Sequence, residues 1–330
     1  MLDFTIKTKS QFGIILLDGF SMLTFGAILE PLTLLHKKNG GDGSGALLFS
    51  QTGLRSQSNG NHTVLCDADI NTLEEYVVGI TGMRVLFVCG PSDRIVPFDQ
   101  SLTATLRRVQ RLGVCIVGLG STPWSLANTG LLSNVPATVH WSTLQAFSET
   151  NNSLEVKDKL FTSARNVATC GGETAALDFI LEMIANDCPM IAREIAAQLL
   201  VSVRRDGETP QPAMNCTAMR NFPTALVKAL SIMSDNVEEP ISKPVLALRC
   251  EVGERHLERL FQAYLRITPM KHYMQIRLKK VHQLVTFTSL SFVEIAVATG
   301  FATTAHMTSK FRDLYGCTPT QLRLKLDFMH

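Results

Sequence analysis

The chain has 330 residues, of which 45% are hydrophobic and 18% charged, with a formal net charge of +2. This composition excludes a disordered chain, a collagen-like fibre and a small disulfide-stapled module, and the length suits two domains. No stretch approaches 18 uninterrupted apolar residues, so no membrane span is expected. Residues 1–10 lack the apolar core of a secretory signal peptide, and we therefore expect a cytoplasmic protein.

The eight cysteines stand singly and form no Cys-x-x-Cys pair. Most of them lie in apolar runs, where a reduced cysteine behaves as a small hydrophobic residue. No group of histidines, cysteines and carboxylates has the spacing of a zinc site. We therefore expect no disulfide framework, no bound metal and no cofactor.

The first part of the chain alternates short apolar runs with helical patterns. Strands are predicted at 12–17, 46–50, 85–89, 114–117 and 138–140, and helices at 22–38, 101–111, 123–129, 171–186 and 191–204. Such alternation is typical of a parallel sheet with helices on both faces. A doubly wound, flavodoxin-like α/β domain is therefore predicted for residues 1–205.

Residues 206–218 contain two prolines, one glycine and little apolar periodicity, which predicts a linker. The remaining part, 219–330, is predicted to be all-α. Its expected helices are 223–234, 242–249, 254–265, 269–286, 292–299, 304–315 and 319–325. Residues 1–218 carry 16 basic and 20 acidic side chains, whereas 219–330 carry 15 and 9. An acidic front part followed by a basic back part is typical of a sensor joined to a nucleic-acid binder.

An internal repeat lies within the helical part. The segment RHLERLF at 255–261 matches AHMTSKF at 305–311, and the following Thr268-Pro269 matches Thr318-Pro319. Each copy has a short helix with a small residue, a tight turn and a second helix. This is the layout of a helix-turn-helix motif, so two such motifs are predicted.

A helix-turn-helix motif places its second helix in the major groove of DNA. The expected DNA-binding residues are Arg255, His256, Glu258 and Arg259 in the first copy, and Thr304, Ala305, His306, Thr308, Ser309 and Lys310 in the second. Arginine can bind guanine through two hydrogen bonds, and glutamate can accept one from cytosine. Phosphate contacts are also expected from Lys243, Arg312 and the group Arg277, Lys279 and Lys280. A solvated surface role is the alternative for each basic residue.

Residues 241–325 resemble the AraC/XylS-type DNA-binding domain, above all in RHLERLFQAYLRITPMKHYMQIRL and IAVATGFATTAHMTSKFRDLYGCTPTQLR. The resemblance implies sequence-specific binding to double-stranded promoter DNA. Three positions depart from the family pattern. Arg266 replaces a glycine, Glu251 stands where the second copy has Gly300, and Ser309 replaces a basic residue.

The first part resembles the ThiJ/PfpI-type, class I amidotransferase-like domain that precedes such DNA-binding modules in GlxA-like regulators. The segments that carry the resemblance are FGIILLDGFSMLTFGAILEPL, GLGSTPWSLANTGLLSNVPATVHW and ATCGGETAALDFILEMIA. Regulators of this layout respond to arginine or to quaternary amines such as betaine and carnitine. The resemblance therefore implies a transcriptional activator with an amino acid or amine as effector, and we expect a homodimer.

Enzymes related to the first part place a cysteine at a strained strand-to-helix turn, beside a carboxylate and a histidine. By this resemblance the cysteine position is Gly120 and the carboxylate position is Thr24, whereas His140 persists. We therefore expect no catalytic residue. One rival is an amidohydrolase-like enzyme with a DNA-binding tail, using Ser121 or Cys115. Another is a ligand-independent regulator whose first domain only dimerises.

A small-molecule site is expected beyond the carboxyl ends of the strands, as in other open α/β sheets. The predicted ligand-binding residues are Gly120, Ser121, Thr122, His140, Trp141 and Glu30. The amides at 120–122 suit a carboxylate at a helix start, and the rings of His140, Trp141 and Trp124 suit an amine. Each ring is equally compatible with an ordinary core position. Glu30 is either a counter-charge or a helix-surface residue.

Overall fold

The computed structural model describes residues 12–80, 82–92, 94–211, 222–288 and 290–327. The chain divides into two compact units, Met1–Gln211 and Pro212–His330. Among the helices in the described ranges, none is long and apolar enough to cross a membrane. The same residues contain no group of histidine, cysteine or carboxylate side chains arranged to hold a metal ion.

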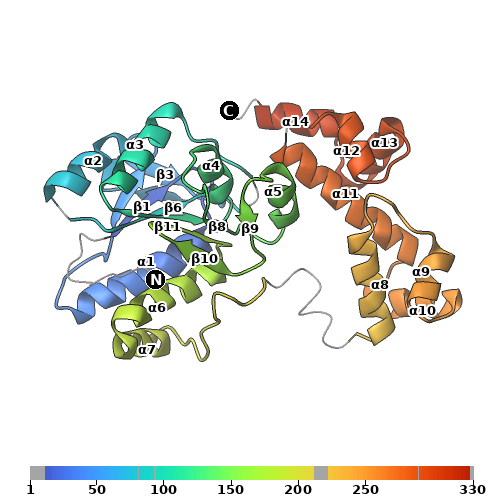
Figure 1. Cartoon of the computed structure of the whole chain (residues 1–330), viewed down its shortest axis with the longest axis horizontal. Helices are drawn as coiled ribbons and strands as arrows, with labels where there is room; N and C mark the ends of the chain where they lie inside the picture. The colour runs from blue at the N-terminus through green and yellow to red at the C-terminus, as the bar shows by residue number, and fades with distance from the viewer. Residues whose placement is uncertain (1–11, 81, 93, 212–221, 289, 328–330) are drawn as a thin grey trace. The chain divides into compact units, whose positions relative to one another are not determined.

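The first unit is built on a seven-stranded sheet (Figure 1). Its strands are β1 (Phe12–Leu16), β2 (Leu47–Ser50), β5 (Ala68–Asp69), β6 (Val85–Cys89), β7 (Cys115–Leu119), β10 (Phe161–Ala164) and β11 (Val167–Cys170). Their order across the sheet is β10-β11-β7-β6-β1-β2-β5, and only the β10–β11 pair is antiparallel. This mostly parallel sheet confirms the predicted α/β class.

Helices cover both faces of this sheet. In Figure 1, α1 (Met22–Lys38), α6 (Thr174–Asp187) and α7 (Pro189–Gln198) lie on one face, and α2 (Leu73–Glu75) and α3 (Gln100–Arg111) on the other. The remaining elements are α4 (Thr122–Asn128), α5 (Leu144–Thr150), the short turns Ile70–Thr72 and Tyr76–Ile80, and the small pairs β3 (Arg55–Gln57) with β4 (Thr63–Leu65) and β8 (Pro136–Ala137) with β9 (Glu155–Val156).

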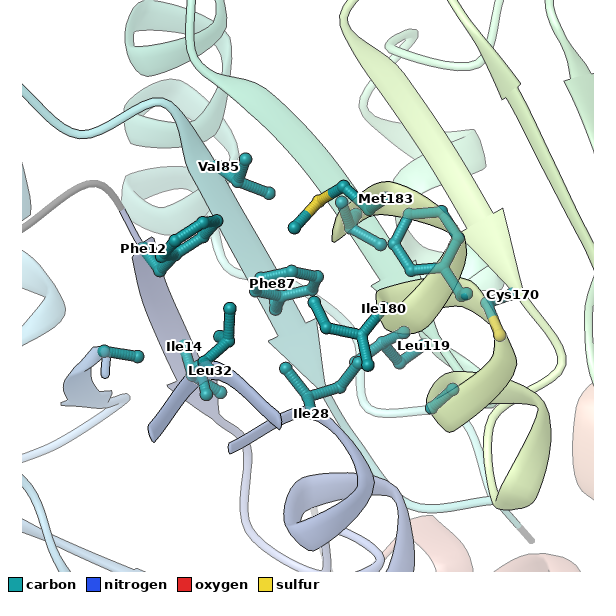
Figure 2. Close-up of a cluster of buried hydrophobic side chains, with 14 of the residues drawn as sticks. Phe12, Ile14, Ile28, Leu32, Val85, Phe87, Leu119, Cys170, Ile180 and Met183 are labelled. Atoms are coloured by element: carbon teal, nitrogen blue, oxygen red, sulfur yellow. The ribbon is translucent and has the colours of Figure 1, made fainter. Parts of the chain in front are cut away.

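The core of the first unit lies between the sheet and the α1–α6 layer. Figure 2 shows Ile14 and Phe87 of two central strands against Ile28 of α1 and Ile180 of α6. Strands β1 and β6 are continuous apolar runs because a parallel sheet is buried on both faces. The four strands predicted from such runs at 12–17, 46–50, 85–89 and 114–117 are confirmed.

Two predictions in the first unit are wrong, and one pair of strands was missed. Residues 138–140 form no strand, because Thr138 bonds through its amide to the Thr169 hydroxyl at 2.8 Å. The helix predicted at 191–204 ends at Gln198, since Leu200 takes a left-handed conformation with φ of +58°. Strands β10 and β11 were not predicted, because their polar residues interrupt the apolar pattern.

All seven helices predicted for the second unit are present (Figure 1). They are α8 (Thr224–Asp235), α9 (Lys243–Arg249), α10 (Glu254–Leu265), α11 (Pro269–Phe287), α12 (Phe292–Ala298), α13 (Thr304–Tyr315) and α14 (Pro319–Asp327). The first helix-turn-helix motif is α9–α10 and the second is α12–α13. Helix α11 contacts helices of both motifs.

The repeat in the sequence is also a repeat of buried positions. Ala247 and Ala296 are buried on the first helices of the two motifs, and Phe261 and Phe311 are fully buried on the second helices. A small alanine side chain lets the two helices of a motif approach closely. The two predicted helix-turn-helix motifs therefore have matching cores.

Candidate nucleic-acid interface and small-molecule site

The second helix of the first motif, α10, separates apolar from polar side chains. Leu257, Leu260 and Phe261 are buried, and the four predicted DNA-binding residues Arg255, His256, Glu258 and Arg259 are exposed. The Glu258 carboxylate lies 2.7 Å from Lys243 Nζ of α9, and Arg259 Nη2 lies 2.9 Å from His256 Nδ1. Exposed pairs of this kind contribute little stability, so DNA groups can replace them at small cost.

Helix α13 presents a less charged face. Its predicted residues Ala305, His306 and Ser309 are exposed, and Thr304, Thr308 and Lys310 are half-buried. Thr303 caps the start of the helix by accepting a hydrogen bond from the His306 amide at 3.2 Å. The two motifs thus offer different groups to DNA: charged side chains in the first, and mainly hydroxyl, methyl and imidazole groups in the second.

Arg277 of α11 has a structural contact in place of the expected phosphate contact. Its Nε donates to the Thr299 carbonyl at 2.8 Å and its Nη2 to the Gly300 carbonyl at 2.6 Å. The guanidinium also lies 4.1 Å from the centre of the Phe301 ring. Burial lowers the pKa of Arg277 and of its neighbour Lys279, and Lys280 is buried. Arg277 therefore fastens the turn of the second motif to α11.

The candidate small-molecule site begins where the parallel strands end. Cys89 of β6 is in register with Leu16 of β1 and with Leu119 of β7, which in turn is level with Cys170 of β11. The strand order runs outward in opposite directions from the β1–β6 pair. In open α/β sheets, ligands bind beyond the carboxyl ends of strands at such a reversal. The segments after these four strands are therefore the candidate site.

Two glycines meet at this edge of the sheet. Gly120 has φ of +69° and donates its amide to the Cys170 carbonyl at 3.0 Å, and Gly172 has φ of +79°. A Cβ on Gly172 would lie 2.9 Å from Gly120 Cα and 3.3 Å from Thr24 Oγ1. The two positions that the resemblance assigns to a nucleophile and a carboxylate, Gly120 and Thr24, therefore lie beside each other. Neither carries the enzymatic side chain.

The polar groups of Ser121 and Thr122 are already engaged within the fold. The Ser121 hydroxyl lies between the carbonyl oxygens of Pro91 at 2.5 Å and Arg94 at 2.6 Å and can donate to one of them, and its amide donates to the Pro91 carbonyl at 3.3 Å. The Thr122 hydroxyl lies 3.1 Å from the Leu119 carbonyl. Two of the three amides expected to hold a ligand carboxylate, those of Gly120 and Ser121, thus bind backbone carbonyls.

The other predicted ligand-binding residues have different environments. His140 and Trp141 are half-buried with ring centres 5.4 Å apart, and the His140 amide donates to the Gly120 carbonyl at 3.4 Å. Trp124 is buried against Phe147, with ring centres 5.0 Å apart, and is a core residue. Glu30 is exposed on α1. The structure therefore brings His140 to the candidate site and leaves Glu30 on a helix surface.

Glu173 is a site residue that sequence reasoning missed. Its carboxylate accepts hydrogen bonds from the hydroxyls of Ser21 at 2.9 Å and Ser92 at 2.5 Å, and its amide donates to Thr24 Oγ1 at 2.7 Å. The residue has φ of +51° at the start of α6. The available signal was the Gly-Gly-Glu sequence between a strand and a helix, where a charged residue interrupts a glycine turn.

The cysteine thiols near this edge are buried. Burial raises the pKa of Cys115 and of Cys170 to about 12. Burial, together with the charge of Glu173, also raises the pKa of Cys89. The thiolate is the nucleophilic form of cysteine, so thiols with such pKa values are protonated at neutral pH.

Residues 199–211 follow α7 and pack on the first unit. This segment includes residues 206–211 of the predicted linker, whereas 212–218 lie outside the described residues. The Gln211 side chain is buried: Oε1 accepts from the Trp141 amide at 2.8 Å, and Nε2 donates to the Val139 carbonyl at 2.7 Å. A Cβ on Gly171 would lie 2.7 Å from Gln211 Oε1. Gln211 therefore packs beside the candidate site.

Known proteins are similar to this chain over part of the second unit and over almost its whole length. Residues 246–325 match the model of a helix-turn-helix domain. The chain is similar to the HTH-type transcriptional regulator GlxA of Rhizobium meliloti (strain 1021), with 30% identity over 96% of this chain and 96% of that protein. It is 29% identical to the HTH-type transcriptional regulator CdhR of Pseudomonas aeruginosa, over 96% of this chain and 93% of that protein. A crystal structure of a ThiJ/PfpI family protein from Pseudomonas syringae matches with a TM-score of 0.49 and 19% identity, covering 68% of this chain and 86% of that one.

Proposed function

Because the chain belongs to the AraC family of helix-turn-helix transcriptional regulators with an N-terminal ThiJ/PfpI-like domain, we propose that it controls promoters in response to a small metabolite. The effector is an amino acid or a quaternary amine, bound at the carboxyl edge of the first sheet. The regulator acts as a cytoplasmic homodimer and activates transcription. Residues 1–205 form the sensor, 206–218 the linker and 219–330 the DNA-binding domain.

Sequence recognition in this proposal comes from the second helix of each motif. Arg255, Glu258 and Arg259 read base edges in one major-groove segment, because arginine pairs with guanine and glutamate with cytosine. Thr304, Ala305 and His306 read the next segment, through hydrogen bonds and contacts to thymine methyl groups. The remaining predicted residues, His256, Thr308, Ser309 and Lys310, flank these contacts. The observation that carries the proposal is that the first set is exposed, and the second exposed or half-buried, above matching buried cores.

In this proposal the first unit binds its ligand and does not catalyse a reaction on it. The enzymatic alternative needs a nucleophile beside a base. The Ser121 hydroxyl is held between two backbone carbonyls, and burial raises the pKa of Cys115 to about 12. Gly120 has no side chain at the position that the resemblance assigns to the nucleophile. These observations favour a sensor over an amidohydrolase.

In this proposal, residues 206–211 couple ligand binding by the first unit to DNA binding by the second unit. Gln211 binds the backbone of Trp141 and packs on Gly171, next to the glycine turn of the site. A ligand that moves His140 or Trp141 therefore changes the anchor from which the chain continues to the DNA-binding unit. Such coupling is a difference in ligand affinity between two arrangements of the protein.

The anchor can be tested with Gln211→Ala, which removes the buried side-chain hydrogen bonds. We expect the variant to keep any ligand-induced rise in its melting temperature and to lose the ligand-induced change in DNA affinity. Gln145→Ala is the control, because Gln145 is an exposed glutamine on α5. A Gln211→Ala protein whose DNA affinity still responds to ligand as the wild type does would contradict this route.

DNA recognition can be tested by enrichment of genomic DNA fragments on the purified protein, followed by anisotropy titration of an enriched fragment. The double variant Arg255→Ala, Arg259→Ala should lose about 1–3 kcal/mol of binding free energy per bidentate contact. Arg111→Ala, Arg193→Ala removes the same charge from exposed positions of the first unit and should bind as the wild type does. Equal affinity of the two double variants for the enriched fragment would refute the assignment.

A further inference from the structure

A negative charge lies where four parallel strands end. Ser21 follows β1, Ser92 follows β6, Gly120 follows β7 and Glu173 follows β11. The carboxylate of Glu173 accepts hydrogen bonds from Ser21 and Ser92, so it joins the segments on both sides of the β1–β6 reversal. This is the place where an open α/β sheet binds its ligand.

Two hydrogen bonds orient the carboxylate of Glu173, but no positively charged side chain of the described residues pairs with it. Its two oxygens each accept one hydroxyl hydrogen bond, at 2.9 and 2.5 Å, and a carboxylate can accept about four. Within the described part of the chain, no lysine, arginine or histidine forms an ion pair with it. Arg94, two residues after Ser92, donates to the Asp18 carbonyl at 3.1 Å.

The backbone at Glu173 has a conformation suited to glycine. Its φ of +51° and ψ of −133° lie in a region that residues with a Cβ rarely adopt. The preceding Gly172 also has a positive φ, of +79°, so a glycine at 173 would continue the same turn without strain. Strained residues of this kind concentrate at ligand sites, where the side chain is needed.

Gly120 lies beside the serine that donates a hydrogen bond to Glu173. A Cβ on Gly120 would lie 3.5 Å from Ser92 Oγ, and this hydroxyl lies 2.5 Å from Glu173. The position that the resemblance assigns to a nucleophilic side chain therefore borders the Ser92–Glu173 pair. A carboxylate held by two hydroxyls provides negative charge there, and it suits an ion pair with a ligand.

We infer that Glu173 recognises the positively charged group of the effector, an ammonium or a guanidinium, through a charge-assisted contact at the β1–β6 reversal. This inference rests on the proposed function, because it takes the first unit to be a sensor. Glu173 thus has the counter-charge role considered for Glu30, which lies exposed on α1.

The test compares charged ligands with neutral ligands of the same shape. Choline is paired with 3,3-dimethylbutan-1-ol, and arginine with citrulline, in thermal-shift and calorimetric titrations of the full-length protein. Glu173→Gln keeps the size of the side chain and removes its charge. Glu173→Gly removes the side chain and relieves the backbone strain. Glu30→Gln is the matched control.

We expect at least one charged probe, and neither neutral one, to raise the melting temperature of the wild type and of Glu30→Gln. Glu173→Gln should bind that probe about tenfold more weakly or worse, as expected for the loss of a charge-assisted contact. Glu173→Gly should melt at a higher temperature than the wild type without ligand and should not respond to the probe. A residue kept only for structure would give the opposite result, a lower melting temperature.

Three outcomes would overturn the inference: equal stabilisation by charged and neutral partners, a wild-type response in Glu173→Gln, or no response of the wild type to either cation. Fragment enrichment on the same proteins separates this failure from that of the proposed function. Retained DNA binding with any of these outcomes overturns only the role of Glu173. Absence of sequence-selective DNA binding by the wild type overturns the proposed function itself.

Discussion

The two helix-turn-helix motifs have equivalent cores but different residues at two backbone positions, one in the turn and one after the second helix. In the second motif, glycines occupy the left-handed positions, with φ of +68° at Gly300 and +72° at Gly316. In the first motif, Glu251 and Arg266 take the equivalent positions with φ of +59° and +58°. The backbone is thus the same although the residues differ. We expect Glu251 and Arg266 to cost stability, because residues with a Cβ are strained in the left-handed conformation.

The largest expected effect on stability comes from a substitution in the turn of the second motif. In Gly300→Ala, the new Cβ would lie 2.5 Å from Pro240 Cδ and 2.7 Å from the Glu238 carbonyl oxygen. Left-handed strain and overpacking together should lower the free energy of unfolding by about 3 kcal/mol. Denaturant titration of the variant measures this loss. Gly253→Ala in the first motif is the control, since a Cβ there has open space and an ordinary φ of −74°. Equal losses in the two variants would show that the contacts with Pro240 and Glu238 do not constrain the turn.

A smaller effect of opposite sign is expected from making the first motif more like the second. Arg266→Gly should raise the free energy of unfolding by about 1 kcal/mol, because glycine adopts a left-handed helix C-cap without strain. Gly316→Ala, at the equivalent position with open space around its Cβ, should lower it by a similar amount. Thermal melts of both variants provide the comparison. A destabilised Arg266→Gly protein would mean that Arg266 makes a favourable contact that outweighs its strain.

The smallest expected effect is a loss of stability at acidic pH. Helix α11 places a histidine against each buried phenylalanine: His272 contacts Phe261 at 5.8 Å between ring centres, and His282 contacts Phe311 at 6.1 Å. Burial lowers the pKa of His272 below its ordinary value of about 6.5. The unfolded chain then binds more protons than the folded one, so stability falls as the pH drops below about 6.5.

His272→Gln removes this titration. Denaturation midpoints of the variant and the wild type at pH 7.5 and 5.5 measure the effect. We expect the wild type to lose more stability than the variant between these two values. The same loss in both proteins would show that His272 does not contribute to the acid sensitivity.

The helical unit was largely predictable because its signals are local. The spacing of Leu257 and Phe261, and of Met307 and Phe311, marks the buried side of each second helix within a few residues. The inward role of Arg277 was not predictable, since a charged residue in a helix normally indicates an exposed face. Its partners, the carbonyls of Thr299 and Gly300, come from a later turn of the chain.

The location of the candidate site in the first unit could be predicted from the sequence, but the role of Glu173 and the contacts of Ser121 could not. Apolar runs located the central strands, and the general behaviour of parallel sheets located the edge. Glu173, however, meets Ser21 and Ser92 only through the fold, across 152 and 81 positions of sequence. Likewise, the carbonyls that engage Ser121 come from the loop after β6, and no periodicity reports such contacts.

Helix α11 has a consequence for the spacing of the DNA sequences that the protein can read. It has 19 residues, so it is about 28 Å long at 1.5 Å per residue. This length approaches one turn of B-DNA, about 34 Å. Because α11 packs on both motifs, it fixes the relative orientation of their second helices, α10 and α13. The two halves of an operator must then lie on one side of the duplex, and half a turn of added DNA between them, about five base pairs, would leave only one motif in register.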